Sequence, residues 1–447
     1  SKRMPYLKDN SLENTFLQTF LFEDTPDQKN VWEEIKCDME SDIPMDRLLC
    51  GDVGFGKTEI AMRAAFRAVC AGKQVAVLVP TTILSSQHFS NFSKRLSPFS
   101  INVDFISGFR SNKEIKNIYY KLKKGIIDII IGTHSLFSKT IAFKQLGLLV
   151  VDEEHRFGVK QKELLLKHNP SLDILTMSAT PIPRTLHLSL SGIKNISTMH
   201  SPPRARLPII TQIKFYNIDL IKRAILFEVK RGGQVFFVHN TVSSLKAIST
   251  NLRRYLPEEI KINTVHGQDN PSNIEKIMVR FIEKKIDVLV CTSIIESGID
   301  IPNANTIIIN KANRMGLSQL YQMRGRVGRG FVQAYAYMLI PEGHSLSKNA
   351  FRRLKGIEKN SELGAGLNIS QADLNIRGAG TVFGYRQSGG ATKVGLGLYT
   401  KMINSALQKQ NIIEKKWAVD PEIVFIKLIQ KHSIPSEYIE SDRIRLE

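Results

Sequence analysis

Short apolar runs alternate with amphipathic segments along most of the chain. Seven such runs predict buried strands, four in the first half and three after residue 208. They span residues 75–79, 126–131, 148–151, 174–177, 234–238, 287–291 and 306–309. Strands that alternate with helices form a parallel sheet covered by helices on both faces. The pattern therefore predicts an α/β fold with two tandem parallel-sheet domains.

Changes in this pattern divide the chain into six parts. Three prolines within residues 201–208 favour an extended linker. Beyond residue 345 the strand pattern stops, and the sequence is typical of helices around a glycine-rich loop. The predicted parts are a docking segment at 1–24, a first domain at 25–200, the linker at 201–208, a second domain at 209–345, a helical module at 346–412 and a helical or mixed segment at 413–447.

The first helix of the first domain is predicted to begin at Thr25. Thr25 suits the N-cap, Pro26 suits the first helical position, and Gln28 stands where a capping box requires it. A second interpretation of Gln28 is that it recognises an adenine base, with Phe22 nearby. The residues leave both interpretations open.

A phosphate-binding loop is the most specific chemical signal in the chain. Residues 51–58 match G-x-x-x-x-G-K-[ST], with a predicted helix following at 58–69. Glycines let the backbone turn its N–H groups inward around an anion, and the helix N-terminus adds positive potential. Lys57 is expected to reach the β- and γ-phosphates, and the Thr58 hydroxyl to bind Mg²⁺. ATP and Mg²⁺ are thus the expected cofactors, and the expected cradle is Gly51, Asp52, Val53, Gly54, Phe55, Gly56, Lys57 and Thr58.

Polar residues follow the predicted strands, at the edge where α/β sheets bind ligands. Asp152 ends an apolar run and is expected to hold Mg²⁺ through its water shell, while Glu153 can orient and deprotonate the attacking water. Three further strand ends carry hydroxyl or histidine groups. These are Thr81 and Thr82, Thr133 and His134, and Ser178 with Thr180.

An arginine-rich segment at residues 322–329 is expected to supply positive charge from the second domain. Arg326 and Arg329 are predicted on a helix, three residues apart, as arginine fingers, with Gln322 near the γ-phosphate or the water. For Arg324 a place in a surface patch that binds DNA is the alternative. Because these groups belong to the other domain, hydrolysis should open and close a cleft between the two.

Composition points to a polyanionic partner. The 447 residues include 62 lysines and arginines against 42 aspartates and glutamates, a formal net charge of +20. Cys37, Cys50, Cys70 and Cys291 form no Cys-x-x-Cys pair and are interpreted as reduced core or near-core thiols of a cytosolic protein. No apolar run has the length of a membrane span.

Together the motifs GDVGFGKT, DEEH, SATPIPRT, TSIIESGID and QMRGRVGR resemble the motif set of superfamily 2 helicases, over residues 22–329. The resemblance implies two RecA-like domains that share one ATP. It also implies roles for residues at matching positions. Gln28 is similar to the adenine-reading glutamine and Phe22 to its stacking partner, Ser178 and Thr180 to the motif that couples hydrolysis to movement, Gly298 and Asp300 to the ribose-side and domain-closing motif, and Thr81, Thr82, Thr133, His134 and Thr292 to residues that track the nucleic-acid backbone.

A narrower resemblance covers the helical module. Residues 363–366, 373–380 and 384–389 resemble the translocation module shared by bacterial transcription-repair coupling factors and RecG helicases, with Arg353 and Arg377 at the positions of its arginines. Several sequence variants, such as Arg-Gly-Ala-Gly at 377–380, favour the coupling factors. The resemblance implies an ATP-dependent translocase on double-stranded DNA. Such factors also engage RNA polymerase and UvrA, through domains that this chain is not expected to include, and residues 435–446 resemble the start of their C-terminal domain.

Two other functions compete with this expectation. One is a RecG-like helicase that remodels forks, and the other is a truncated module that binds DNA without hydrolysing ATP. Intact Lys57, Glu153, Arg326 and Arg329 favour an active enzyme over the second alternative.

Overall fold

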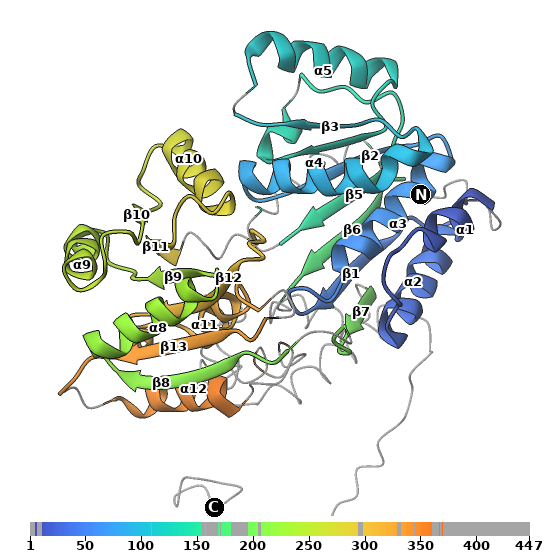
Figure 1. The fold of residues 1–447 in the computed structure, drawn as a ribbon. Helices are drawn as coiled ribbons and strands as arrows, with labels where there is room; N and C mark the ends of the chain where they lie inside the picture. The colour runs from blue at the N-terminus through green and yellow to red at the C-terminus, as the bar shows by residue number, and fades with distance from the viewer. Residues whose placement is uncertain are drawn as a thin grey trace, which may run out of the picture. The chain divides into compact units, whose positions relative to one another are not determined.

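The computed structural model describes residues 5–6, 11–108, 110–138, 140–153, 157, 169, 171–179, 195–203, 207–293, 298–328, 332–343, 346–359, 366 and 369. All of them lie in one compact unit, Ser1–Thr400. Within it are two sheets flanked by helices (Figure 1). The predicted fold of two parallel-sheet domains is therefore confirmed. The predicted helical module is not confirmed, since little beyond residue 359 is described.

The first sheet has the strand order β3-β4-β2-β5-β6-β1-β7, and its pairings are parallel. Its strands are β1 (Asp46–Gly51), β2 (Gln74–Leu78), β3 (Val103–Ile106), β4 (Ile129–Gly132), β5 (Leu146–Asp152), β6 (Asp173–Ser178) and β7 (Asn195–Met199). Its helices are α1 (Ser11–Gln18), α2 (Pro26–Met39), α3 (Lys57–Cys70), α4 (Thr82–Leu96) and α5 (Asn112–Lys124).

Both faces of this sheet are buried. Val75, Val77 and Val79 belong to a cluster with residues of α2, α3 and α4, whereas Ala76 and Leu78 belong to a second cluster with residues of α5. Neighbouring residues of a strand point to opposite faces, so an uninterrupted apolar run is what a sheet with two covers requires.

The second sheet has the order β10-β11-β9-β12-β13-β8, again with parallel pairings. Its strands are β8 (Ile210–Phe215), β9 (Gln234–Val238), β10 (Ile262–Val265), β11 (Val288–Cys291), β12 (Ala304–Ile309) and β13 (Tyr335–Ile340). The helices here are α8 (Ile218–Lys230), α9 (Val242–Tyr255), α10 (Pro271–Ile282), α11 (Leu317–Arg324) and α12 (Lys348–Lys359), with a short 3₁₀ helix η5 (Ala312–Arg314).

The amino-terminal helix α1 is clamped onto α3. The rings of Phe16 and Phe66 stack with centroids 4.3 Å apart and planes 6° apart. Arg67 Nη1 lies 2.8 Å from Glu13 Oε2, and the Arg95 guanidinium lies 4.1 Å above the Phe16 ring. Stacking and an ion pair thus join this segment to α3, the helix that begins at Lys57, and the cation–π contact joins it to α4.

Two smaller expectations meet the structure differently. The capping box at Thr25 is confirmed, since Thr25 Oγ1 accepts from the Gln28 N–H at 3.2 Å and Gln28 Oε1 accepts from the Thr25 N–H at 2.9 Å. The prediction of core thiols is wrong for Cys37 and Cys70, which are exposed because they lie on the outward sides of their helices. Among the described residues no helix is long and apolar enough to span a membrane.

Candidate functional site

The loop between β1 and α3 adopts backbone angles that favour glycine. Gly54 has φ of +83° and Gly56 has φ of +89°, in the left-handed region. A Cβ added at Gly56 would lie 2.3 Å from Gln28 Nε2. The loop leads into α3 at Lys57, so its N–H groups and the helix N-terminus are available to an anion. These features fit the triphosphate of ATP.

Lys57 is held inside this loop. Its ammonium donates hydrogen bonds to the carbonyl oxygens of Gly51 and Asp52, the latter at 2.9 Å. Burial lowers the pKa of Lys57, although the carboxylates of Glu153 and Asp152 act in the opposite direction. The lysine is therefore positioned at the loop before any phosphate arrives.

The structure confirms the capping interpretation of Gln28, and the adenine-reading interpretation stays a prediction. Beyond its capping box, Gln28 Nε2 donates to the Phe55 carbonyl at 2.8 Å, so the glutamine joins the start of α2 to the phosphate loop. Phe22 is 68% exposed and lies edge-on to Phe20, with ring centroids 5.7 Å apart. An exposed ring at this place is free to stack on a base.

Asp152 and Glu153 lie at the end of β5, two strands from the loop. Glu153 is 6% exposed, its N–H donates to the Met177 carbonyl at 3.0 Å, and its φ of +53° is rare outside glycine. Ser178 is buried at the end of the intervening strand β6, in register with Cys50 of β1. The serine thus stands between the loop and the two acids.

Three neighbouring side chains shift the pKa of Asp152. Burial acts to raise this pKa, but a hydrogen bond and charge from His88, followed by the charges of Lys57 and Arg326, lower it overall. His88 Nε2 lies 3.3 Å from Asp152 Oδ2. Sequence reasoning missed His88, because it lies on α4 within an ordinary helical pattern and no spacing relates it to the acid.

Arg326 comes from the second sheet's side of the chain and is 2% exposed. A Cβ added at Gly298 would lie 3.8 Å from Arg326 Nη1, and the charge of Arg326 acts to lower the pKa of Asp152. The prediction that Arg326 lies on a helix is wrong: α11 ends at Arg324, because Gly325 caps it and Gly328 adopts φ of +73°. Arg326 therefore projects from the turn after the helix, and Arg329 lies outside the described residues.

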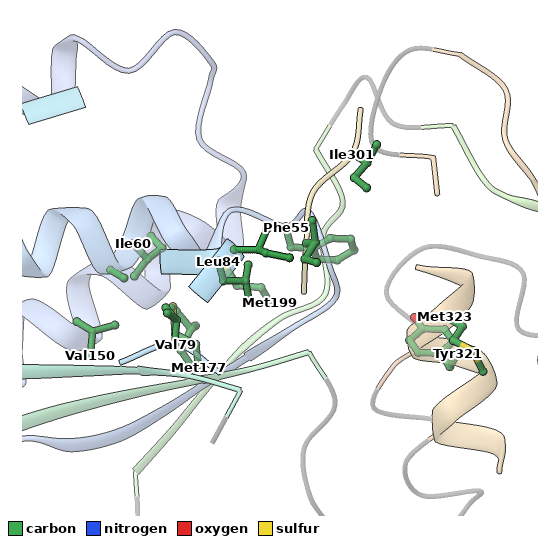
Figure 2. Close-up of a cluster of buried hydrophobic side chains, with 14 of the residues drawn as sticks. Phe55, Ile60, Val79, Leu84, Val150, Met177, Met199, Ile301, Tyr321 and Met323 are labelled. Atoms are coloured by element: carbon green, nitrogen blue, oxygen red, sulfur yellow. The ribbon is translucent and has the colours of Figure 1, made fainter. Parts of the chain in front are cut away.

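Helix α11 touches the phosphate loop directly. The Tyr321 hydroxyl donates to Asp52 Oδ2, and a Cβ added at Gly325 would lie 3.4 Å from Val53 Cγ2. Burial and the Asp52 charge raise the pKa of Tyr321, so the hydroxyl stays protonated and remains a donor. Figure 2 labels Tyr321 and Phe55 in one hydrophobic cluster, which runs across both sheets.

Two arginines serve structural contacts. Arg324 is 3% exposed and donates through Nη1 to the Ile357 carbonyl of α12 at 3.1 Å, so its predicted place in a surface patch is wrong. Arg353 Nη2 donates to the Asn313 carbonyl of η5 at 3.1 Å. Arg324 thus joins α11 to α12, and Arg353 joins α12 to η5.

Gln322 is half-buried on α11, one residue from Tyr321. Gly298 and Asp300 lie against α4: Gln87 donates through Nε2 to the Asp300 carbonyl at 2.8 Å and accepts from the Asp300 N–H at 3.0 Å. A Cβ added at Gly298, where φ is +85°, would lie 3.2 Å from Leu84 Cδ1. A larger residue at Gly298 would therefore disturb this contact between the two sheets' sides.

A cavity of about 220 Å³ gathers four of the residues predicted to follow a nucleic-acid backbone. Thr81, Thr82, Thr133 and His134 line one side of it, and residues of α10 line the other. The Thr82 hydroxyl lies 3.4 Å from Glu275 Oε2. Thr292 is buried just after β11 and is not among the residues that line this cavity. Thr180 and Arg377 lie outside the described residues.

The donor set fits Mg²⁺ better than a protein-only metal cage. Among the described residues no group of three or more His, Cys, Asp or Glu side chains could hold a metal ion. Mg²⁺ characteristically uses one or two protein oxygens, water and substrate phosphates. Thr58 and Asp152 are the residues that would hold it beside a bound triphosphate, where it would neutralise phosphate charge.

Comparisons with known proteins identify the two sheets. Residues 25–188 match the DEAD/DEAH box helicase family, and residues 216–330 match the helicase conserved C-terminal domain. The chain is 49% identical over 431 residues to the transcription-repair-coupling factor of Myxococcus xanthus, and 46% identical over 442 residues to that of Staphylococcus epidermidis. These alignments cover 96% and 99% of this chain but only 36% and 38% of the relatives.

Solved structures agree with these matches. RecG bound to a three-way DNA junction aligns with a TM-score of 0.74 and 34% identity, covering 90% of this chain and 53% of that chain. A Saccharomyces cerevisiae Dbp5 variant bound to RNA and ADP BeF3 has a TM-score of 0.57 and 16% identity, covering 79% of this chain and 97% of that chain, which shows a shared fold. The chain belongs to the family of ATP-hydrolysing helicases and translocases that contains the transcription-repair-coupling factors and RecG.

Proposed function

We propose that this chain is an ATP-driven translocase on double-stranded DNA and the motor of a transcription-repair coupling factor. The observation that carries the proposal is the contact of the segment containing Arg326 with the phosphate loop, where Tyr321 donates to Asp52 and a Cβ added at Gly325 would lie 3.4 Å from Val53 Cγ2. An arginine supplied across a cleft can stabilise the charge that develops on a transferring phosphoryl group. Closure of the cleft around ATP would then be tied to hydrolysis, as directed movement requires.

Within this proposal each residue at the cleft has a distinct task. Gly51 to Thr58 cradle the triphosphate, and Lys57 moves from the loop carbonyls to the phosphates. Glu153, held at the strand end with its N–H on Met177, orients the attacking water and accepts its proton. Arg326, together with Arg329 and Gln322, supplies the charge and polar contact from the second domain.

The cavity beside α4 is proposed as part of the path of the DNA backbone. Threonine hydroxyls and a histidine suit contacts with phosphate, which set position without reading sequence. Thr292, Arg353 and Arg377 would extend this path. A formal net charge of +20 supports a polyanionic partner.

Hydrolysis is tested by phosphate release with and without duplex DNA. We expect Lys57→Ala and Glu153→Gln each to reduce turnover at least about a hundredfold, and Arg326→Ala to reduce it about a thousandfold. Arg254→Ala, an exposed arginine on α9, is the matched control and should keep the wild-type rate. Normal turnover by Glu153→Gln would contradict the assigned water-activating role.

Translocation is tested by displacement of a third strand from duplex DNA. Arg377→Ala should keep DNA-stimulated hydrolysis but lose displacement, and duplex affinity should fall steeply with salt. Stimulation by single-stranded RNA and not by duplex DNA would reject a duplex translocase.

The place of this motor in repair is part of the same proposal. By its resemblance to transcription-repair coupling factors, the full protein is proposed to act on stalled RNA polymerase and to engage UvrA. This chain spans little more than a third of such relatives. Similarity to RecG on a DNA junction favours a second candidate, fork remodelling. A branch-migration assay on model forks tests for the second candidate. A coupling-factor motor should instead displace a halted polymerase, and only when joined to the rest of the factor.

A further inference from the structure

Helix α4 connects three places that the proposed mechanism treats separately. At its N-terminus Thr82 lines the cavity proposed for the DNA backbone. One and a half turns later, Gln87 exchanges two hydrogen bonds with the backbone of Asp300. The next residue, His88, contacts Asp152 at the nucleotide site. The residues 84, 87 and 88 share one helix face, because side chains three and four positions apart lie together.

The environment of His88 holds its ring in one orientation. The side chain is 8% exposed, and its ring meets Phe92 edge-on with centroids 6.1 Å apart. Its Nε2 lies 3.3 Å from Asp152, whereas Nδ1 is buried and has no hydrogen-bond partner among the described residues. Burying an imidazole with one nitrogen unpaired costs free energy. The polar contact that this ring does make is the one with the acid.

We propose that His88 is a positioning residue for Asp152, through which α4 couples contact with DNA to the nucleotide site. A carboxylate at the end of a strand can rotate, and a donor from a packed ring holds it in one rotamer, as partners of metal-ligating groups do. Thr82 and His88 are about 9 Å apart along one helix. Because a helix moves as a unit, a displacement of its N-terminus by a bound phosphate backbone reaches the bond to Asp152.

This inference rests on the proposed DNA path for its input and on the ATP site for its output. The test compares His88→Leu, which removes the donor at similar volume, with His88→Gln, which keeps an N–H donor. Ser90→Ala, an exposed position on the same helix, is the control. We expect His88→Leu to lower the DNA-stimulated kcat for ATP about 10–100-fold with the KM for ATP within about twofold of wild type. His88→Gln should recover most of the loss, and Ser90→Ala should match wild type.

A second measurement does not depend on turnover. A non-hydrolysable ATP analogue should change the Kd of the wild-type chain for duplex DNA by about fivefold or more, and coupling of this kind is reciprocal. In His88→Leu that factor should fall to within about twofold of unity, while each ligand alone still binds. Gln87→Ala should reduce this factor as well, because it removes the two hydrogen bonds between α4 and the backbone of Asp300.

Four outcomes decide the matter. Wild-type kcat and wild-type coupling in a folded His88→Leu variant would overturn the inference, as would equal losses in His88→Gln and His88→Leu. If His88→Leu does not fold, His88→Gln and Gln87→Ala carry the comparison, and an uncoupled Gln87→Ala with full ATP affinity supports the inference. A wild-type chain whose hydrolysis ignores duplex DNA would instead reject the proposed function.

Discussion

Gly56 offers a prediction whose size follows from two separate features of the phosphate loop. Alanine at this position would have to adopt φ of +89°, and its Cβ would lie 2.3 Å from Gln28 Nε2. The backbone strain alone costs about 1–2 kcal/mol. Gln28 is buried and makes two hydrogen bonds, to Phe55 and Thr25, that its displacement would weaken at about 1 kcal/mol each. We therefore expect Gly56→Ala to lower the free energy of unfolding by about 3–4 kcal/mol.

Gly72 provides the matched comparison. It follows α3 with φ of +71°, and a Cβ there would meet nothing within 4 Å. Gly72→Ala should therefore show only the strain, about 1–2 kcal/mol. Urea unfolding can be followed by the fluorescence of Trp32 in α2, in a Trp417→Phe background that leaves Trp32 as the only tryptophan.

Binding of a fluorescent ATP analogue completes the test. Gly56→Ala should weaken it at least about tenfold because the loop's N–H groups lose their orientation, whereas Gly72→Ala should leave it unchanged. Equal losses of stability in the two variants would refute the role assigned to Gln28. Wild-type nucleotide affinity in Gly56→Ala would refute the need for glycine in the cradle.

Two further predictions concern contacts that join elements of the first sheet to elements of the second. Burial raises the pKa of Glu275 to about 6, although the hydrogen bond from Thr82 acts to lower it. The protonated carboxyl therefore makes its full contribution to the free energy of unfolding below pH 4.5, and this contribution is lost as the pH rises through about 6. Glu275→Gln should gain about 0.5–1 kcal/mol over wild type at pH 8 after solvent screening and nothing at pH 4, and a gain of the same size at both pH values would exclude this linkage. Tyr321→Phe removes the hydroxyl that donates to the Asp52 carboxylate, which should lower the free energy of unfolding by about 1.5–3 kcal/mol. Hydrogen exchange of the α11 amides should become faster in this variant, whereas Tyr255→Phe on α9 should leave it unchanged.

Most of the interior strands could be predicted from the sequence, because their apolar runs are uninterrupted. The strand at 234–238 has the predicted bounds, and those at 148–151 and 174–177 extend by only one or two residues at each end. The run at 126–131 starts too early, because Gly125 caps α5 and the strand begins at Ile129. Six strands were missed. Four of them, β3, β7, β8 and β10, lie at the sheet edges, where half-exposed residues break the apolar pattern. The other two, β1 and β13, lie inside the sheets, but charged residues begin β1 and half-buried tyrosines interrupt β13.

The candidate site divides in the same way. Residues joined by local spacing, such as Lys57 with Thr58 or Asp152 with Glu153, were predicted from motifs. Contacts between distant segments were not, because Tyr321 on Asp52 and His88 on Asp152 depend on how helices dock and leave no spacing in the sequence. The helix end at Arg324 was missed, although Gly325 and Gly328 could have indicated it.

The clamp of α1 on α3 has a mechanical consequence. Tension applied to the chain before residue 11 enters through Phe16 and Glu13 and is delivered to Phe66 and Arg67, on the helix whose first residue is Lys57. A pull on this segment would thus act on α3, the helix that begins at Lys57. A partner that pulls on the N-terminal segment would therefore act on the helix that follows the phosphate loop.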